Sequence, residues 1–104
     1  MIRTAVGAES VHVVVVLTVR ENSDVERVAS LLERQATLSR DEPGCERFEV
    51  FHSQNDPAVF MLVETWANAA ALAQHREAEA FKTLYEPEVL PLVERTPHPS
   101  TKLA

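Results

Sequence analysis

Residues 42–75, which read EPGCERFEVFHSQNDPAVFMLVETWANAAALAQH, are the stretch that decides the fold. They contain a turn, a predicted strand, a second turn, a strand that ends in the only tryptophan, and the start of a helix. Most side chains suited to chemistry also lie within this stretch. Its residues therefore predict a small α+β domain, with a pocket beside the helix as a hypothesis.

Length and composition predict a single domain of ordinary type. The chain has 104 residues, of which 45% are hydrophobic and 25% charged, and its formal net charge is −6. A domain of this size buries about two-thirds of the surface that its unfolded chain exposes, so a partner surface would add stability. The acidic balance and the lack of clustered Lys and Arg argue against nucleic acid as a partner.

The sequence also indicates where the domain begins and in which compartment it works. The longest apolar run, residues 13–17, is too short to cross a membrane, and no secretory signal pattern precedes it. The single cysteine, Cys45, excludes an internal disulfide. We expect residues 1–10 to form a flexible leader, residues 11–104 to form one domain, and the protein to be cytoplasmic.

Residues 11–20 read VHVVVVLTVR and predict a strand, because β-branched residues favour strands. Val13, Val15 and Leu17 would point to one face, and Val14 and Val16 to the other. Both faces are apolar, so both should be covered. Helices can cover only one face in so short a chain, which leaves the other for a second subunit or a ligand.

The first predicted helix begins at a capping-box pattern, in which Ser23 is followed three residues later by Glu26. Apolar spacing continues the helix to about Arg40, with an inner face that includes Gln35 and Leu38. Pro43 and Gly44 then turn the chain.

Residues 45–53 and 58–66 predict a hairpin joined by the turn-forming residues 54–57. A four-residue loop would pair Ser53 with Ala58, and this register divides the side chains between two faces. The apolar face under the helices would carry Phe48, Val50, His52, Val59, Met61 and Val63. The mixed face would carry Arg47, Glu49, Phe51, Phe60, Leu62 and Glu64, and we expect Glu64 to pair with Arg47.

The second half of the chain predicts further helices. Asn68 is a good N-cap for a helix that places His75 on its apolar side. Phe81 and Tyr85 belong to a second helical face, which we expect to end at Pro87, and residues 90–93 suit one more turn. A tail strand at residues 100–104 would complete a ferredoxin-like β-α-β-β-α-β order with an antiparallel sheet.

These motifs resemble those of the antibiotic biosynthesis monooxygenase family, in particular its quinol monooxygenase-like branch. The resemblance rests on EPGCxRFEV at residues 42–50, the turn at Asp56-Pro57, FxLxExW at residues 60–66, AALAQH at residues 70–75, and Phe81. It covers roughly residues 11–95. The resemblance implies a dimeric α/β barrel, in which the sheet packs on that of a second subunit, and oxidation of quinols or phenols by dioxygen without a bound cofactor.

Such chemistry requires a base and a pocket that excludes water. We expect His75, His52 and Trp66 to carry the reaction, and a small aromatic or quinol-like molecule to be the ligand. The side chains expected to bind it are Tyr85, Phe81, Phe48, Met61 and Glu64.

Each of these residues also has a purely structural interpretation. His75 could be a packing histidine, and His52 could be exposed beside the loop. Strict alternation puts Trp66 on the mixed face, so that only a twist or bulge would turn it towards the helices. Scattered histidines show no metal-ligand spacing, and Tyr85 replaces the histidine that haem-degrading relatives use to hold iron. No metal or cofactor is therefore expected.

Two other functions compete with oxygenation. An isomerase of a small carbonyl or phosphorylated metabolite would need clustered cations, and only Arg47, Arg76 and Lys82 are available. A non-catalytic binding protein would have a pocket filled by its own side chains, without converging polar groups.

Overall fold

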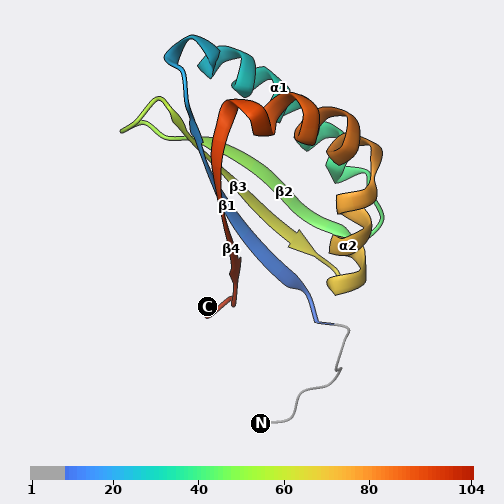
Figure 1. Ribbon diagram of the computed structural model, residues 1–104. Coiled ribbons are helices and arrows are strands. Elements are labelled where there is room, and N and C mark those ends of the chain that lie inside the picture. The colour runs from blue at the N-terminus through green and yellow to red at the C-terminus, as the bar shows by residue number, and fades with distance from the viewer. Residues whose placement is uncertain (1–8) are drawn as a thin grey trace.

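The computed structural model describes residues 9–104, so most of the expected leader, residues 1–10, lies outside the described residues. The described chain begins with a strand and a helix, continues with two strands and a run of helices, and ends with a strand (Figure 1). The strands are β1 (Val11–Val19), β2 (Cys45–His52), β3 (Val59–Trp66) and β4 (Val93–Ser100). The helices are α1 (Val25–Arg40), α2 (Ala69–Glu77) and the π-helix η2 (Ala80–Val89), with short 3₁₀ turns η1 (Asn22–Asp24) and η3 (Leu90–Leu92).

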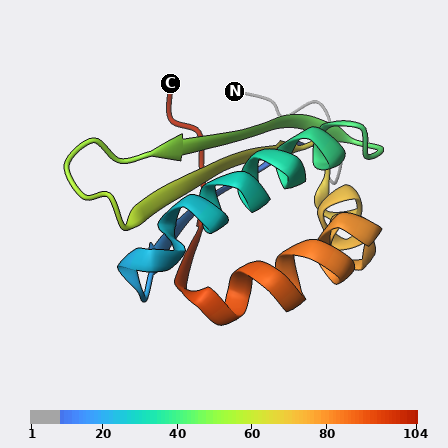
Figure 2. The same ribbon diagram turned by 90° about the horizontal axis from the view of Figure 1, so that it is seen from above.

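The sheet has the order β2-β3-β1-β4, and all neighbouring strands are antiparallel. The helices lie on one face of this sheet (Figure 2). The ferredoxin-like α+β fold expected from the sequence is thereby confirmed.

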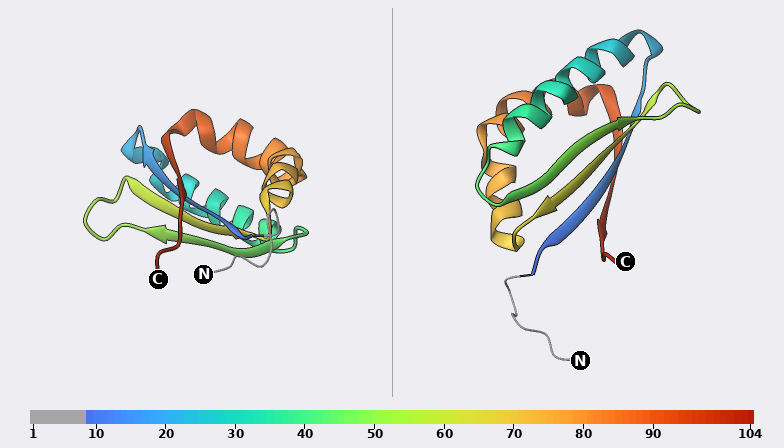
Figure 3. Two further views of the ribbon diagram at one scale, coloured as in Figure 1. Left: turned by 90° about the horizontal axis from the view of Figure 1, so that it is seen from below. Right: turned by 180° about the vertical axis from the view of Figure 1, so that it is seen from behind.

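The burial pattern of β1 shows which face of the sheet the helices cover. Val13, Val15 and Leu17 are buried beneath the helices, whereas Val14 and Val16 between them are only half-buried. Within residues 9–104, the helices all lie on the opposite face of the sheet from Val14 and Val16 (Figure 3). β1 is therefore apolar on both faces, although the helices cover only one of them.

The pairing of β2 with β3 differs by one residue from the expected register. His52 lies opposite Phe60, and the Ser53 amide donates to the Val59 carbonyl at 3.0 Å, so the loop comprises residues 54–58. A shift of one residue moves every side chain of a strand to the other face. Met61 therefore lies on the open face, and the expected position of Glu64 and Trp66 on that face was wrong.

The end of the hairpin contains the bulge that the sequence left open. Cys45 pairs with Trp66 and Arg47 pairs with Thr65, which leaves Glu46 as the extra residue. Trp66, however, already faces the helices by simple alternation with Glu64, given the observed register. The length of the loop at the other end of the hairpin sets the register and therefore the face of the sheet on which Trp66 lies.

The helix boundaries confirm some expectations and correct others. α1 ends at Arg40, as expected, but η1 precedes it and no side-chain cap forms, so the Ser23–Glu26 capping box was wrong. Leu38, placed on the inner face from the sequence, is 45% exposed. The Asn68 cap is confirmed, because its Oδ1 accepts from the Ala71 amide at 2.9 Å.

The C-terminal region departs further from expectation. η2 continues through Pro87 instead of ending there. In an α-helix the proline ring clashes with the carbonyl four residues back, and the wider π turn relieves that contact. β4 begins at Val93 and includes Pro97 and Pro99, so the fourth strand precedes the tail that the sequence analysis proposed for it. An edge strand tolerates such prolines.

Gly44 is the residue at which the turn before β2 is most constrained. Its φ of +81° is unfavourable for other residues, and an added Cβ would lie 2.5 Å from the Ala71 Cβ. We predict that Gly44→Ala lowers the free energy of unfolding by about 1–3 kcal/mol. Urea unfolding measures this, with the exposed loop substitution Gln54→Ala as the control. Equal stability of the two variants would show that the turn relaxes freely.

Candidate functional site

His75 lies at the centre of a buried polar cluster. It sits in the last turn of α2, is 4% exposed, and its Nδ1 is 2.7 Å from Glu42 Oε1. Because a carboxylate only accepts hydrogen bonds, the neutral ring in this contact carries its hydrogen on Nδ1. Nε2 is then left with a lone pair, which is what a general base needs.

Trp66 and Glu64 lie beneath this ring, both on the covered face of β3. The Trp66 ring stacks on His75 with centroids 4.4 Å apart. The indole Nε1 donates to Glu64 Oε1 at 3.0 Å, and the same oxygen is 4.0 Å from His75 Nε2. His75 therefore lies between two carboxylates, hydrogen-bonded to Glu42 and separated from Glu64 by a gap.

Aromatic rings surround the imidazole on its remaining sides. Phe48 lies 5.8 Å from His75 between ring centroids, and Phe81 meets it edge-on at 5.5 Å. Phe81 in turn contacts Tyr85 at 5.1 Å. Arg95 Nε donates to the Tyr85 oxygen at 3.0 Å, which leaves the phenol hydrogen available for donation.

A small cavity lies between the helices and the sheet at this point. Its volume is about 10 Å³, which is room for about one water molecule. A larger ligand enters only if the wall moves, and Leu72 and Phe81 are the half-buried apolar parts of that wall. The lining residues are Val13, Gln35, Glu64, Leu72, His75, Arg76, Phe81, Tyr85 and Arg95.

Burial dominates the electrostatics of two lining residues. Desolvation raises the pKa of Glu64, although the Trp66 hydrogen bond and the nearby His75, Arg95 and Arg76 act in the opposite direction. Desolvation also raises the pKa of Tyr85, again opposed by Arg95. Both side chains thus hold protons more tightly than they would in water, which suits them to hydrogen-bond donation.

The structure brings together six of the eight predicted site residues. His75, Trp66 and Glu64 form the cluster, and Tyr85, Phe81 and Phe48 adjoin it.

The other two site residues lie elsewhere. His52 is exposed at the far end of the hairpin, where it stacks on Phe60 at 4.1 Å and contacts the Pro57 carbonyl at 2.7 Å. Met61 is on the open sheet face. The expected Glu64–Arg47 pair was also wrong, since Arg47 binds Glu49 at 2.6 Å.

Three site residues were missed by the sequence analysis: Glu42, Gln35 and Arg95. Glu42 was treated only as part of a turn, and Arg95 lay outside the expected fourth strand. Gln35 did carry a signal, because it is a polar residue at an apolar position of a helix. A buried polar position of this kind is a reason to look for a partner.

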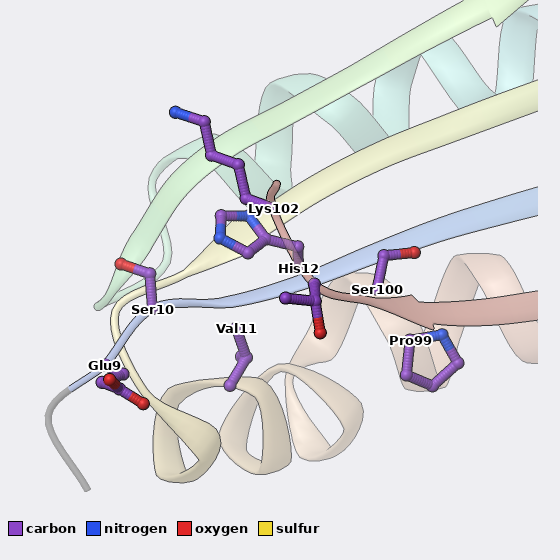
Figure 4. Close-up of a pocket in the computed structure, with 8 residues that line it drawn as sticks. Glu9, Ser10, Val11, His12, Pro99, Ser100 and Lys102 are labelled. Carbon is purple, nitrogen blue, oxygen red and sulfur yellow. The ribbon is translucent and has the colours of Figure 1, made fainter. Parts of the chain in front are cut away.

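Other parts of the described chain are weaker candidates for a functional site. A hollow at the start of β1 and the end of β4 is lined by exposed or half-exposed side chains such as Ser10, His12 and Lys102 (Figure 4). Within residues 9–104, no group of three or more His, Cys, Asp or Glu side chains is placed to hold a metal ion. No helix there is long and apolar enough to span a membrane.

Comparison with known proteins gives a family and a fold. The family model for antibiotic biosynthesis monooxygenases matches residues 10–87. A solved structure from Bacteroides thetaiotaomicron, described as a conserved protein of unknown function and possible oxidoreductase, is 25% identical, with a TM-score of 0.83 over 89% of this chain and 97% of that one. No curated protein matches at a significant level.

Two further solved structures show the same fold at lower identity. One, described as an antibiotic biosynthesis monooxygenase, is 24% identical with a TM-score of 0.79, covering 89% of this chain and 99% of the other. The second is a mutant of SnoaB, a cofactor-independent oxygenase from Streptomyces nogalater. It is 16% identical with a TM-score of 0.81, covering 93% and 96% of the two chains.

The raised pKa of Glu64 predicts a pH-dependent stability. The folded state binds this proton more tightly than the unfolded chain, so stability falls as the pH rises through the interval above the ordinary value of 4.5. Glu64→Gln keeps an acceptor for Trp66 without the charge, and should be more stable than the wild type at pH 7.

Urea unfolding at a series of pH values measures this effect. We expect the difference between Glu64→Gln and wild type to grow from pH 4 to pH 7. Glu33→Gln, an exposed carboxylate on α1, is the matched control and should show no such trend. A Glu64→Gln difference that is constant across the pH range would contradict the prediction.

Proposed function

The chain belongs to the antibiotic biosynthesis monooxygenase family, and we propose that it oxidises a quinol or a similar small aromatic with dioxygen, without a bound cofactor. For a quinol the balanced reaction is quinol plus dioxygen giving hydroxyquinone plus water. One oxygen atom enters the ring and the other leaves as water, while the quinol loses four electrons. The observation that carries the proposal is His75, which lines the cavity and whose Nδ1 is hydrogen-bonded to Glu42, so that Nε2 keeps its lone pair.

The proposed role of His75 is to take the proton from a substrate hydroxyl. The resulting anion is electron-rich enough to reduce dioxygen, and recombination of the two forms a carbon–oxygen bond to a peroxide. His75 returns its proton to that peroxide, which then loses water. Glu42 stabilises the positive charge that His75 carries in between, and stacking on Trp66 fixes the plane of the ring.

Entry of a substrate requires the cavity to widen. The wall that can yield is formed by α2 and η2, which are joined through Ala78 in an extended conformation. Leu72 and Phe81 belong to this wall, and both line the cavity while remaining partly exposed. We propose that displacement of these two side chains opens the site, and that their return excludes water during the reaction.

The competing functions account less well for the site. Arg76 and Arg95 line the cavity, but Arg95 already donates to Tyr85. Lys82 pairs with Glu77 and Glu86, and Arg47 pairs with Glu49 on the open face, so two of the three cations considered for an isomerase lie outside the site. The small cavity volume agrees with a non-catalytic binding protein. The convergence of His75 and Glu64 in one cavity does not agree with that function, because a protein that only binds a ligand gains nothing from burying two titratable side chains.

We assign Tyr85 no role as a haem ligand. Its oxygen accepts a hydrogen bond from Arg95, and desolvation raises its pKa, so the phenolate that iron prefers is disfavoured. Its phenol hydrogen instead suits orientation of a substrate oxygen.

We also propose a homodimer through the open sheet face. This face carries several apolar side chains beside the Arg47–Glu49 ion pair, and Phe51 among them is 48% exposed. Val14 and Val63 pair across β1 and β3 at its centre. An exposed apolar surface of this kind indicates an interaction site, and a second copy of the same sheet is its natural complement. The apolar members are Val14, Val16, Phe51, Val59, Met61 and Val63.

The oxygenase proposal predicts dioxygen uptake with reduced quinones above the spontaneous rate. His75→Asn should lower kcat by about 100- to 10,000-fold, because general-base catalysis contributes on that scale. An oxygen electrode with a panel of quinols measures this. The matched control is His52→Asn at the far end of the hairpin, which should retain activity. Wild-type uptake no faster than the buffer blank would refute the proposal.

The dimer proposal predicts that a charge at the centre of the open face separates the subunits. Val63→Lys should sediment as a monomer where the wild type sediments as a dimer, because burying an unpaired ammonium is costly. Leu38→Lys adds the same charge to an exposed apolar position on α1 and should leave the dimer intact. A wild type that is monomeric at all concentrations in sedimentation velocity would rule out this interface.

A further inference from the structure

Gln35 is a buried polar side chain whose carboxamide oxygen has no partner. It lies on the inner face of α1, is 1% exposed, and its Oε1 receives no hydrogen bond. Leu32 and Ala36, its neighbours on that face, are apolar, so nothing in the helix itself calls for an amide there. An unsatisfied buried acceptor is destabilising, and such groups are rare in folded proteins. Its presence therefore needs an explanation outside the helix.

The position of Gln35 supplies that explanation, because it lines the same cavity as His75 and Glu64. The three side chains come from α1, α2 and β3, so they approach the cavity from different elements. Gln35 Oε1 and the His75 Nε2 lone pair are both hydrogen-bond acceptors without a donor among the described residues. The Tyr85 phenol also lines the cavity, but it does not donate to Gln35 Oε1, so a ligand that brings two O–H groups would satisfy both acceptors.

We propose that Gln35 binds the second hydroxyl of the substrate and thereby selects dihydroxy aromatics of the quinol type over simple phenols. This inference rests on the proposed function, since it takes His75 to bind the first hydroxyl. A quinol then donates one O–H to His75 Nε2 and the other to Gln35 Oε1. A molecule whose second oxygen is methylated leaves Gln35 unpaired and places an ether oxygen against an acceptor.

The other polar side chains around the cavity do not supply the hydrogen bond that Gln35 Oε1 lacks. Arg95 and Arg76 are the cations that line the cavity, but Arg95 already donates to Tyr85, and neither is bonded to Gln35. The cavity has room for about one water molecule, which could occupy the position of a ligand hydroxyl when the site is empty. Such a water is the kind that a hydroxyl group replaces without loss of hydrogen bonds.

The test compares two probes that differ by one methyl group, hydroquinone and 4-methoxyphenol, by anaerobic isothermal titration. Without dioxygen no turnover occurs, so binding is measured independently of oxygenase activity. We expect the wild type to bind hydroquinone about tenfold or more tightly than 4-methoxyphenol. Gln35→Met, which keeps the length of the side chain without the acceptor, should bind both probes about equally.

A second variant and a matched control keep the result interpretable. Gln35→Leu should behave like Gln35→Met, and both should melt at or above the wild-type temperature, because an unsatisfied group is removed. Ser39→Ala is the control: the Ser39 hydroxyl is also buried and unpartnered on α1, but it does not line the cavity. It should keep the wild-type preference for hydroquinone.

The outcomes separate this inference from the proposed function. A preference that is equal in wild type and Gln35→Met overturns the role of Gln35, even if quinols are oxidised. A wild type that shows no preference, or binds neither probe, overturns it as well. A preference lost in Gln35→Met supports it, even if the oxygen electrode detects no turnover and the oxygenase proposal fails.

Discussion

The register in which β2 pairs with β3 determines which side chains the helices cover, because a shift by one residue would move the other set of β3 side chains beneath them. Because the loop comprises residues 54–58, His52 lies opposite Phe60, and Glu64 and Trp66 face inwards. The opposite assignment would have put Met61 and Val63 inside and left the carboxylate on the open face. The polar cluster beneath α2 and the apolar character of the open face are thus two results of one hairpin register.

The cluster also shows how polar groups can be kept inside so small a domain. Trp66 donates to Glu64, and Glu42 holds His75, so most of the buried polar atoms are paired within the chain. Gln35 and Ser39 are exceptions, both on the inner face of α1. Local departures from good packing rules are expected at functional sites, where binding matters more than stability. Here the two unpaired polar side chains lie in the C-terminal half of α1.

The overall fold was predictable because it depends on patterns that span many residues. The β-branched run before α1 and the apolar spacing within α1 each predict one element from several side chains. The candidate site was less predictable, because it depends on single-residue features. Loop length decided the face of Trp66, and the true start of β4 at Val93 decided that Arg95 reaches Tyr85. The stretch of residues 42–75 nonetheless contributed Glu42, Glu64, Trp66 and His75, all of which meet in the structure.

The prolines of β4 have a consequence for how the sheet can associate. β4 and β2 are the two edges of the sheet, where unpaired backbone groups can recruit a strand from another molecule and begin aggregation. Pro97 and Pro99 remove donors from one edge, while the charged side chains Arg47 and Glu49 line the other. Lateral growth of the sheet is blocked at both sides. Contacts between molecules are therefore directed to the open face of the sheet, where the proposed pairing of two copies would cover the apolar side chains of both.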